Sequence, residues 1–160
     1  MTSPNDREPT VEPTLVVGYG RDPSSDHALL VATDFARRLG ARLHVVHTVC
    51  LADYPVDPDA WDWEEQGAAG LAEQRRSVAR LLGDTDVAWS YEDRRGDPAC
   101  ELARAAAEHD ALLIVVGTRG EGLRRALARL VDPSVSHGVI QRQRRPVLVV
   151  PAHPRSESER

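Results

Sequence analysis

The sequence contains no lysine, because all 20 cationic side chains among its 160 residues are arginines. A chain without lysine cannot supply the phosphate-binding lysine of a P-loop, a Schiff-base lysine or the lysine pair of a tRNA-synthetase signature loop. Several classes of nucleotide-using enzyme are therefore excluded.

Cysteine is scarce and long hydrophobic runs are missing. The two cysteines, Cys50 and Cys100, form no CxxC pair, which fits a reducing compartment. The longest apolar runs, residues 111–116 and 146–150, are far shorter than the roughly 20 residues of a membrane-spanning helix. The first residues are polar and lack the apolar core of a signal peptide. We therefore expect a cytoplasmic protein without a membrane partner.

The length and charge predict one acidic globular domain. A chain of 160 residues with 28% charged and 41% hydrophobic residues is typical of a single compact domain. We place this domain at residues 13–152, with disordered polar tails at residues 1–12 and 153–160. The net charge of −5 disfavours a nucleic-acid partner, although arginines gather between Arg119 and Arg129.

The hydrophobic pattern alternates between strands and helices. Short apolar or β-rich runs predict strands, helical spacing of apolar residues predicts helices, and Asp-Pro pairs or glycines mark helix ends. The predicted strands are residues 14–20, 42–49, 87–91, 111–116 and 146–150, and the predicted helices are residues 23–39, 68–82, 98–106 and 134–141. This order predicts an α/β fold, a parallel sheet with helices on both faces.

Two glycine-bearing turns follow strands of this sheet. Ligands of such sheets bind beyond the carboxyl ends of the strands, where the winding reverses. The turns at residues 18–25 and 117–122 would meet there. Glycines let backbone N–H groups approach an anion, and Arg119 could offer its guanidinium to a phosphate. A plain connecting turn explains the same spacing, so both interpretations stay open.

The histidines do not suggest a metal site. His44 and His47 are three residues apart on a predicted strand, so their side chains point to opposite faces and cannot chelate one ion. His137 stands alone beside the second turn. We expect structural or surface roles for all three, and we predict neither a metal nor a catalytic residue.

Long segments of the sequence resemble the universal stress protein family. VVGTRG at residues 115–120, SVSHGVI at residues 134–140 and RRPVLVVP at residues 144–151 resemble the C-terminal half of that family, and residues 16–49 resemble its N-terminal half. The segment from Gly96 to Gly120 is similar to the link between its third and fourth strands. Together these stretches span nearly the whole chain.

The resemblance implies a fold, an assembly and a ligand. The implied fold is a Rossmann-like five-stranded parallel sheet of order 3-2-1-4-5, dimeric through the last strand, here Pro146 to Val150. The nucleotide-binding branch of the family holds ATP between the first-strand turn and a G-x2-G-x9-G-[ST] loop. The candidate nucleotide-binding residues are therefore Gly18, Gly20, Gly117, Arg119, Gly120, Ser134 and Ser136.

Three departures from the family pattern concern the nucleotide site. Gly20 stands where the family usually has an aspartate lining the site. The spacer after Gly120 is longer than nine residues. Pro133-Ser134, preceded by Asp132, replaces the Gly-[ST] pair. Proline offers no N–H, and an N-cap aspartate occupies the donors that would otherwise bind phosphate.

The sequence thus predicts a homodimeric stress-response or regulatory binding module with a degenerate nucleotide site, not an enzyme, which could contact a regulatory protein partner. The alternative is a genuine ATP-binding member with at most slow hydrolysis, with Mg²⁺ present only when ATP is bound. A ligase or transferase on a related sheet is disfavoured, because the turn YGRDPSSD lacks the glycine pair of the SGGxDS pyrophosphatase loop.

Overall fold

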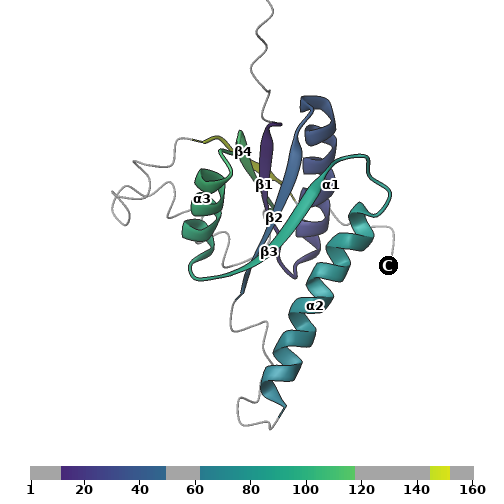
Figure 1. Ribbon diagram of the computed structural model, residues 1–160, viewed down its shortest axis with the longest axis vertical. Helices are drawn as coiled ribbons and strands as arrows, with labels where there is room; N and C mark the ends of the chain where they lie inside the picture. The colour runs from purple at the N-terminus through teal and green to yellow at the C-terminus, as the bar shows by residue number, and fades with distance from the viewer. Residues whose placement is uncertain (1–11, 50–61, 118–144, 152–160) are drawn as a thin grey trace, which may run out of the picture.

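The computed structural model describes residues 12–49, 62–117 and 145–151. Its centre is a five-stranded parallel sheet in the order β3-β2-β1-β4-β5, as the sequence and its resemblance predicted (Figure 1). The strands are β1 (Thr14–Gly18), β2 (Arg42–Val49), β3 (Trp89–Arg95), β4 (Leu113–Gly117) and β5 (Val147–Val150).

Helices cover both faces of the sheet in the described part of the chain. They are α1 (Pro23–Leu39), α2 (Trp63–Leu82) and α3 (Pro98–Glu108). The ribbon shows α1 and α2 on one side of the sheet and α3 on the other (Figure 1). None of these helices combines the length and apolar character needed to cross a membrane. The predicted helix at residues 134–141 lies outside the described residues.

The Asp-Pro pairs begin two helices, as predicted. Asp22 Oδ1 accepts a hydrogen bond from the Ser24 backbone N–H at 2.8 Å, and Pro23 is the first residue of α1. Asp97 Oδ1 accepts from the Cys100 N–H at 3.1 Å, and Pro98 begins α3. In both places the carboxylate satisfies a donor that the helix itself leaves unpaired.

Some element bounds differ from the predicted ones. β3 runs to Arg95 instead of ending at Tyr91, because its polar continuation pairs in register with β2 up to Val49. α2 begins at Trp63, with Glu64 in its first turn, where the positive end of the helix dipole favours acidic side chains. In each case a polar stretch outside the predicted element is part of it.

The core consists of two apolar layers separated by the sheet. The layer on the side of α1 and α2 contains Leu15, Leu29 and Leu43, each fully buried. The layer under α3 contains Val16, Val46 and Leu102. Val45 and Val46 are neighbours on β2 but belong to different layers, because successive strand residues face opposite sides. The sheet is therefore fixed from both faces.

Candidate functional site

The turn after β1 lies at the carboxyl edge of the sheet, where the sequence placed a ligand site. Gly18 ends β1 and Gly117 ends the neighbouring β4, so both glycines lie at the same edge of adjacent parallel strands. Of the predicted nucleotide-binding residues, the structure thus brings together Gly18, Gly20 and Gly117. Arg119, Gly120, Ser134 and Ser136, together with Asp132-Pro133, lie outside the described residues.

Backbone donors of this turn are used within the chain. The Tyr19 N–H donates to the Val46 carbonyl oxygen at 2.9 Å, and the Gly20 N–H donates to Ser25 Oγ at 3.0 Å. The Ser24 N–H donates to the Asp22 side chain and the Ser25 N–H to the Asp22 carbonyl oxygen, both at 2.8 Å. Four of the N–H groups that could face an anion here are therefore already paired, and the Asp22 carboxylate adds a negative charge at the start of α1.

Gly117 allows β4 and α1 to approach closely. A Cβ atom at this position would lie 2.8 Å from the carbonyl oxygen of Ser24 and 2.9 Å from its Oγ. By contrast, a Cβ atom at Gly20 would have Ser25 Oγ as its one neighbour, at 3.6 Å. The glycine at position 117 is thus required by packing, whereas the one at position 20 leaves room for a side chain.

Tyr19 anchors the same turn from inside. Its side chain is 5% exposed, and its hydroxyl donates to Asp26 Oδ1 at 2.6 Å. Its carbonyl oxygen lies 2.9 Å from His47 Nδ1. Burial, with the nearby Asp26 carboxylate adding to it, raises the pKa of Tyr19 well above its usual range. The phenol is therefore held in its neutral, donating form.

The raised pKa of Tyr19 predicts a loss of stability in alkali. Above about pH 10 the unfolded chain releases the phenolic proton while the folded chain retains it, so the free energy of unfolding falls as the pH rises. We expect Tyr19→Phe to cost about 1 kcal/mol near neutral pH, through the lost hydrogen bond, and to weaken the alkaline decline. Urea unfolding of the wild type and of Tyr19→Phe at about pH 8 and about pH 11 measures the two declines in stability. Equal declines in the two proteins would contradict the prediction.

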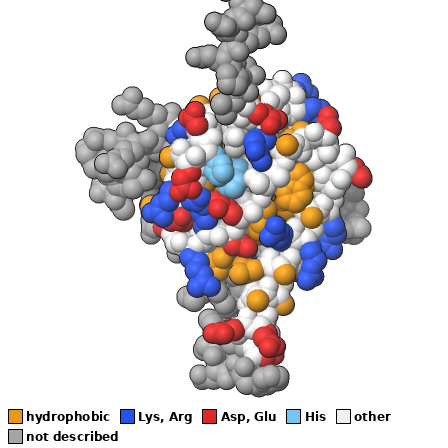
Figure 2. Space-filling view, in the orientation of Figure 1, with side chains coloured by type: hydrophobic (Ala, Val, Ile, Leu, Met, Phe, Trp, Pro, Cys, Tyr) orange, Lys and Arg blue, Asp and Glu red, His pale blue; other side chains and the backbone are white. Residues whose placement is uncertain are grey.

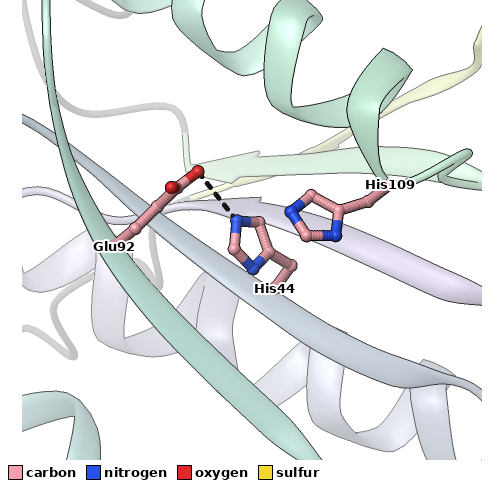
Figure 3. Close-up of side chains that lie close together, drawn as sticks. All are labelled: His44, Glu92 and His109. Atoms are coloured by element: carbon pink, nitrogen blue, oxygen red, sulfur yellow. Dashed lines mark hydrogen bonds and ion pairs between the residues drawn. The ribbon is translucent and has the colours of Figure 1, made fainter.

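A second cluster of chemically active side chains lies on the α3 face of the sheet. It consists of His44 on β2, Glu92 on β3 and His109, which ends α3 (Figure 3). His44 is 5% exposed, and its Nε2 is 2.9 Å from Glu92 Oε1 while its Nδ1 is 2.8 Å from Ser90 Oγ. The rings of His44 and His109 have centroids 3.8 Å apart.

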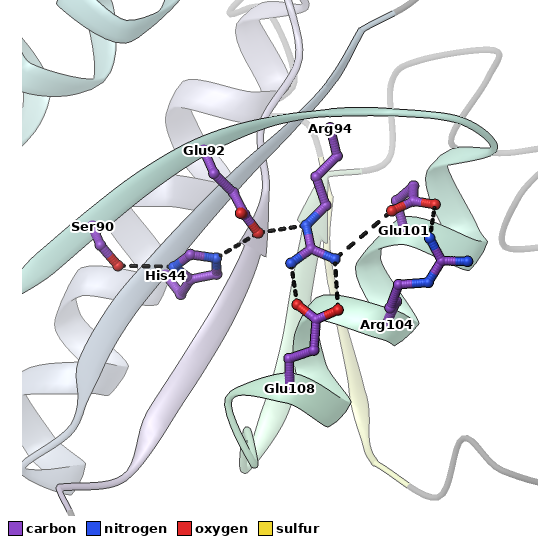
Figure 4. A network of polar contacts seen from close by, with 7 residues as sticks. All are labelled: His44, Ser90, Glu92, Arg94, Glu101, Arg104 and Glu108. Carbon is purple, nitrogen blue, oxygen red and sulfur yellow. Dashed lines mark hydrogen bonds and ion pairs between the residues drawn. The ribbon is translucent and has the colours of Figure 1, made fainter.

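An ion-pair network continues from this cluster (Figure 4). Arg94, with a side chain 12% exposed, donates to the carboxylates of Glu92 and Glu108 and lies 3.7 Å from Glu101 Oε2. Arg104 donates to Glu101 Oε1 at 2.9 Å. Burial alone would raise the pKa of Glu92, but hydrogen bonds from His44 and Arg94 outweigh it and lower that pKa. The hydrogen bond from Arg94 likewise lowers the pKa of Glu108.

Sequence reasoning missed this cluster. His44 and His47 do lie on opposite faces, as predicted: the former contacts side chains of β3 and the latter the turn after β1. However, the partners of His44 come from β3 and from the end of α3, and no local spacing connects these segments. The available signal was the alternation of side chains in β3, which puts Ser90, Glu92 and Arg94 on one face of the sheet. On that face Ser90 is the register partner of His44, and Glu92 is the register partner of Val46.

Comparison with known proteins identifies the family. The model of the universal stress protein family matches residues 13–151. A solved structure of a protein of this family from Burkholderia pseudomallei is 28% identical, with a TM-score of 0.62 over 87% of this chain and 96% of that one. No curated protein sequence matches the chain.

Two further structures were solved with nucleotides. A universal stress protein in complex with cAMP is 29% identical, with a TM-score of 0.53 over 86% of this chain and 96% of the other. The universal stress protein from Archaeoglobus fulgidus in complex with dAMP is 18% identical, with a TM-score of 0.59 over 86% and 96% of the two chains, and it shares the fold. With the family match covering nearly all of the sheet and its helices, this chain belongs to the universal stress protein family.

Proposed function

We propose that this universal stress protein is a dimeric cytoplasmic stress-response module that regulates by binding, without catalysis, and that its nucleotide site is degenerate. The observation that carries this proposal is the turn after β1, whose Tyr19, Gly20, Ser24 and Ser25 N–H groups are all paired inside the chain. A phosphate at this turn would have to displace these bonds and approach the Asp22 carboxylate.

Sequence features beyond this turn support the same proposal. Asp132-Pro133 repeats the pair that caps α1 and α3, and in both helices the aspartate occupies a helix N-terminal donor. Two like charges about 4 Å apart repel by about 1 kcal/mol in water and about 4 kcal/mol near a protein surface. An aspartate beside a phosphate would therefore lower ATP affinity by roughly fivefold to a thousandfold.

The second candidate function is genuine binding of an adenine nucleotide. It is favoured by the 29% identical relative in complex with cAMP. Arg119, Arg124 and Arg125 offer charge that could offset an aspartate. In that case ATP would be held with Mg²⁺, and the hydrolysis of bound ATP would be slow.

A thermal-shift titration with Mg-ATP separates the two functions. A ligand that binds only the folded state stabilises it by RT ln(1 + [L]/Kd), so the rise in melting temperature grows with affinity and with ligand concentration. We compare the wild type with Asp132→Gly/Pro133→Gly, which restores the family's loop chemistry, and with Gly20→Asp, which restores its carboxylate at a position with room for one. Stabilisation of a restored variant alone supports the degenerate site. Equal stabilisation of the wild type supports the second function.

The proposed dimer interface is the outer edge of β5. This strand lies at the end of the sheet and, within the described residues, pairs with β4 alone. Val149 on this strand is 43% exposed. An edge strand with an exposed apolar side chain is suited to pairing with a second copy, which extends the sheet across the dimer.

A charge on this edge is expected to dissociate the dimer. Val149→Asp would place a carboxylate on each copy at the proposed contact, so like charges would oppose pairing. Sedimentation velocity at micromolar concentration should then change from a dimer to a monomer. Leu30→Asp, at a similarly exposed apolar position on α1, is the control and should stay dimeric. A monomeric wild type would refute the interface.

A further inference from the structure

We propose that His44, Glu92 and His109 form a binding site for a divalent transition-metal ion of the zinc type. The site lies on the α3 face of the sheet, toward the amino end of β2, whereas the candidate nucleotide site lies at the carboxyl ends of the strands. It is therefore separate from nucleotide binding and does not depend on the proposed function.

The donor set and its spacing fit such an ion. Two imidazoles and one carboxylate are ligands that zinc takes, with a fourth position left for water. One ligand atom from each side chain lies within 4.8 Å of the others. Ligands of a tetrahedral zinc ion are about 3.3 Å apart, from metal–ligand distances of about 2.0–2.1 Å. His44 Nε2 and Glu92 Oε1, at 2.9 Å, are already near this spacing.

His109 supplies the adjustable part of the site. It is exposed, whereas His44 is buried, and it ends α3, so its side chain can move without disturbing the core. In Figure 3 one of its ring nitrogens is turned toward the other two side chains. Figure 2 shows a histidine side chain at the surface beside acidic and basic side chains. Because His109 is exposed, an ion could reach the cluster from solvent.

Ser90 is placed to orient His44 as a ligand. Its hydroxyl lies 2.8 Å from Nδ1, on the other side of the ring from Glu92. A hydroxyl can donate or accept, so the imidazole proton can move from Nε2 to Nδ1, where Ser90 accepts it, while Nε2 binds the ion. Hydrogen bonding at the second ring nitrogen is the usual way in which proteins fix a metal-binding histidine.

The surrounding charges leave a negative charge for the cation. The carboxylates of Glu92, Glu101 and Glu108 face two guanidinium groups, those of Arg94 and Arg104, so one negative charge remains (Figure 4). Partial burial, with His44 contributing, lowers the pKa of His109. A lower pKa favours the neutral ring, which is the form that binds metals.

Calorimetric titration of the metal-free full chain with zinc chloride tests the site. We expect one zinc ion per chain, and a rise in melting temperature because the ion links β2, β3 and α3. His109→Ala and Glu92→Gln should each weaken zinc binding by about a hundredfold, and Ser90→Ala by about tenfold. His27→Ala, which removes a histidine of α1, is the matched control and should bind as the wild type does.

Cobalt(II) identifies the ligands directly. Its visible absorption reports the geometry of the site, and a thiolate ligand adds a strong charge-transfer band. We expect a tetrahedral or five-coordinate spectrum without that band, lost in His109→Ala. Because His109 is exposed, this variant should fold, which circular dichroism without metal verifies. Unchanged zinc affinity in His109→Ala, or a thiolate band, would overturn the proposal.

Discussion

Replacing Gly117 with alanine is expected to lower the free energy of unfolding by about 2–3 kcal/mol. The new methyl group would lie 2.8 Å from the Ser24 carbonyl oxygen, a distance that real Cβ atoms do not adopt. The obstructing atom belongs to the backbone in the first turn of α1, so no side-chain rotation relieves the contact. Either α1 or the end of β4 must shift.

The matched control for this prediction is Gly20→Ala in the neighbouring turn. Its methyl group would make one ordinary contact, with Ser25 Oγ at 3.6 Å. We therefore expect a change within about 0.5 kcal/mol, or a slight stabilisation because alanine restricts the unfolded chain. Urea unfolding of the two variants measures the difference. Equal stability of Gly117→Ala and Gly20→Ala would show that β4 and α1 do not approach as closely as described.

Replacing Arg94 with methionine is expected to lower the free energy of unfolding by about 2 kcal/mol. Methionine keeps much of the length of the side chain but removes the cation that Glu92 and Glu108 share. Glu101, 9% exposed at its side chain, also loses a neighbouring positive charge. The remaining carboxylates would then repel one another across β3 and α3.

Salt separates this electrostatic cause from lost packing. Repulsion between the remaining carboxylates is screened by added salt, so the difference between wild type and Arg94→Met should shrink in about 1 M sodium chloride. Arg104→Met removes an arginine that is 64% exposed at its side chain and pairs with Glu101 on one helix. This control should cost less than about 0.5 kcal/mol. If the loss of stability in Arg94→Met does not change with salt, lost packing is its cause instead.

The fold was predictable because its signals are local. Apolar runs predicted β1, β2 and β4, and the Asp22-Pro23 and Asp97-Pro98 pairs predicted where α1 and α3 begin. Strand order came from the family resemblance, since periodicity does not specify which strands are neighbours. The polar end of β3 was missed because an edge strand has fewer apolar residues, and pairing with β2 outweighs that polarity.

The candidate sites were less predictable because they depend on contacts between distant segments. The sequence located the turns after β1 and β4, but it did not show that Gly20 and Ser24 donate their N–H groups within the chain. Nor did it show that Glu92 and His109 approach His44. In both cases the contact is made with a residue placed by another part of the fold, and a sequence motif does not show which residue that is.

Equilibrium dialysis of the wild-type chain against labelled ATP with Mg²⁺ tests the degenerate nucleotide site most directly. We predict that the wild type binds at least about fivefold more weakly than Asp132→Gly/Pro133→Gly, because a capping aspartate repels phosphate. Saturable binding of one ATP per wild-type chain, as tight as in that variant, would contradict a degenerate site and establish this protein as a genuine ATP-binding member of its family.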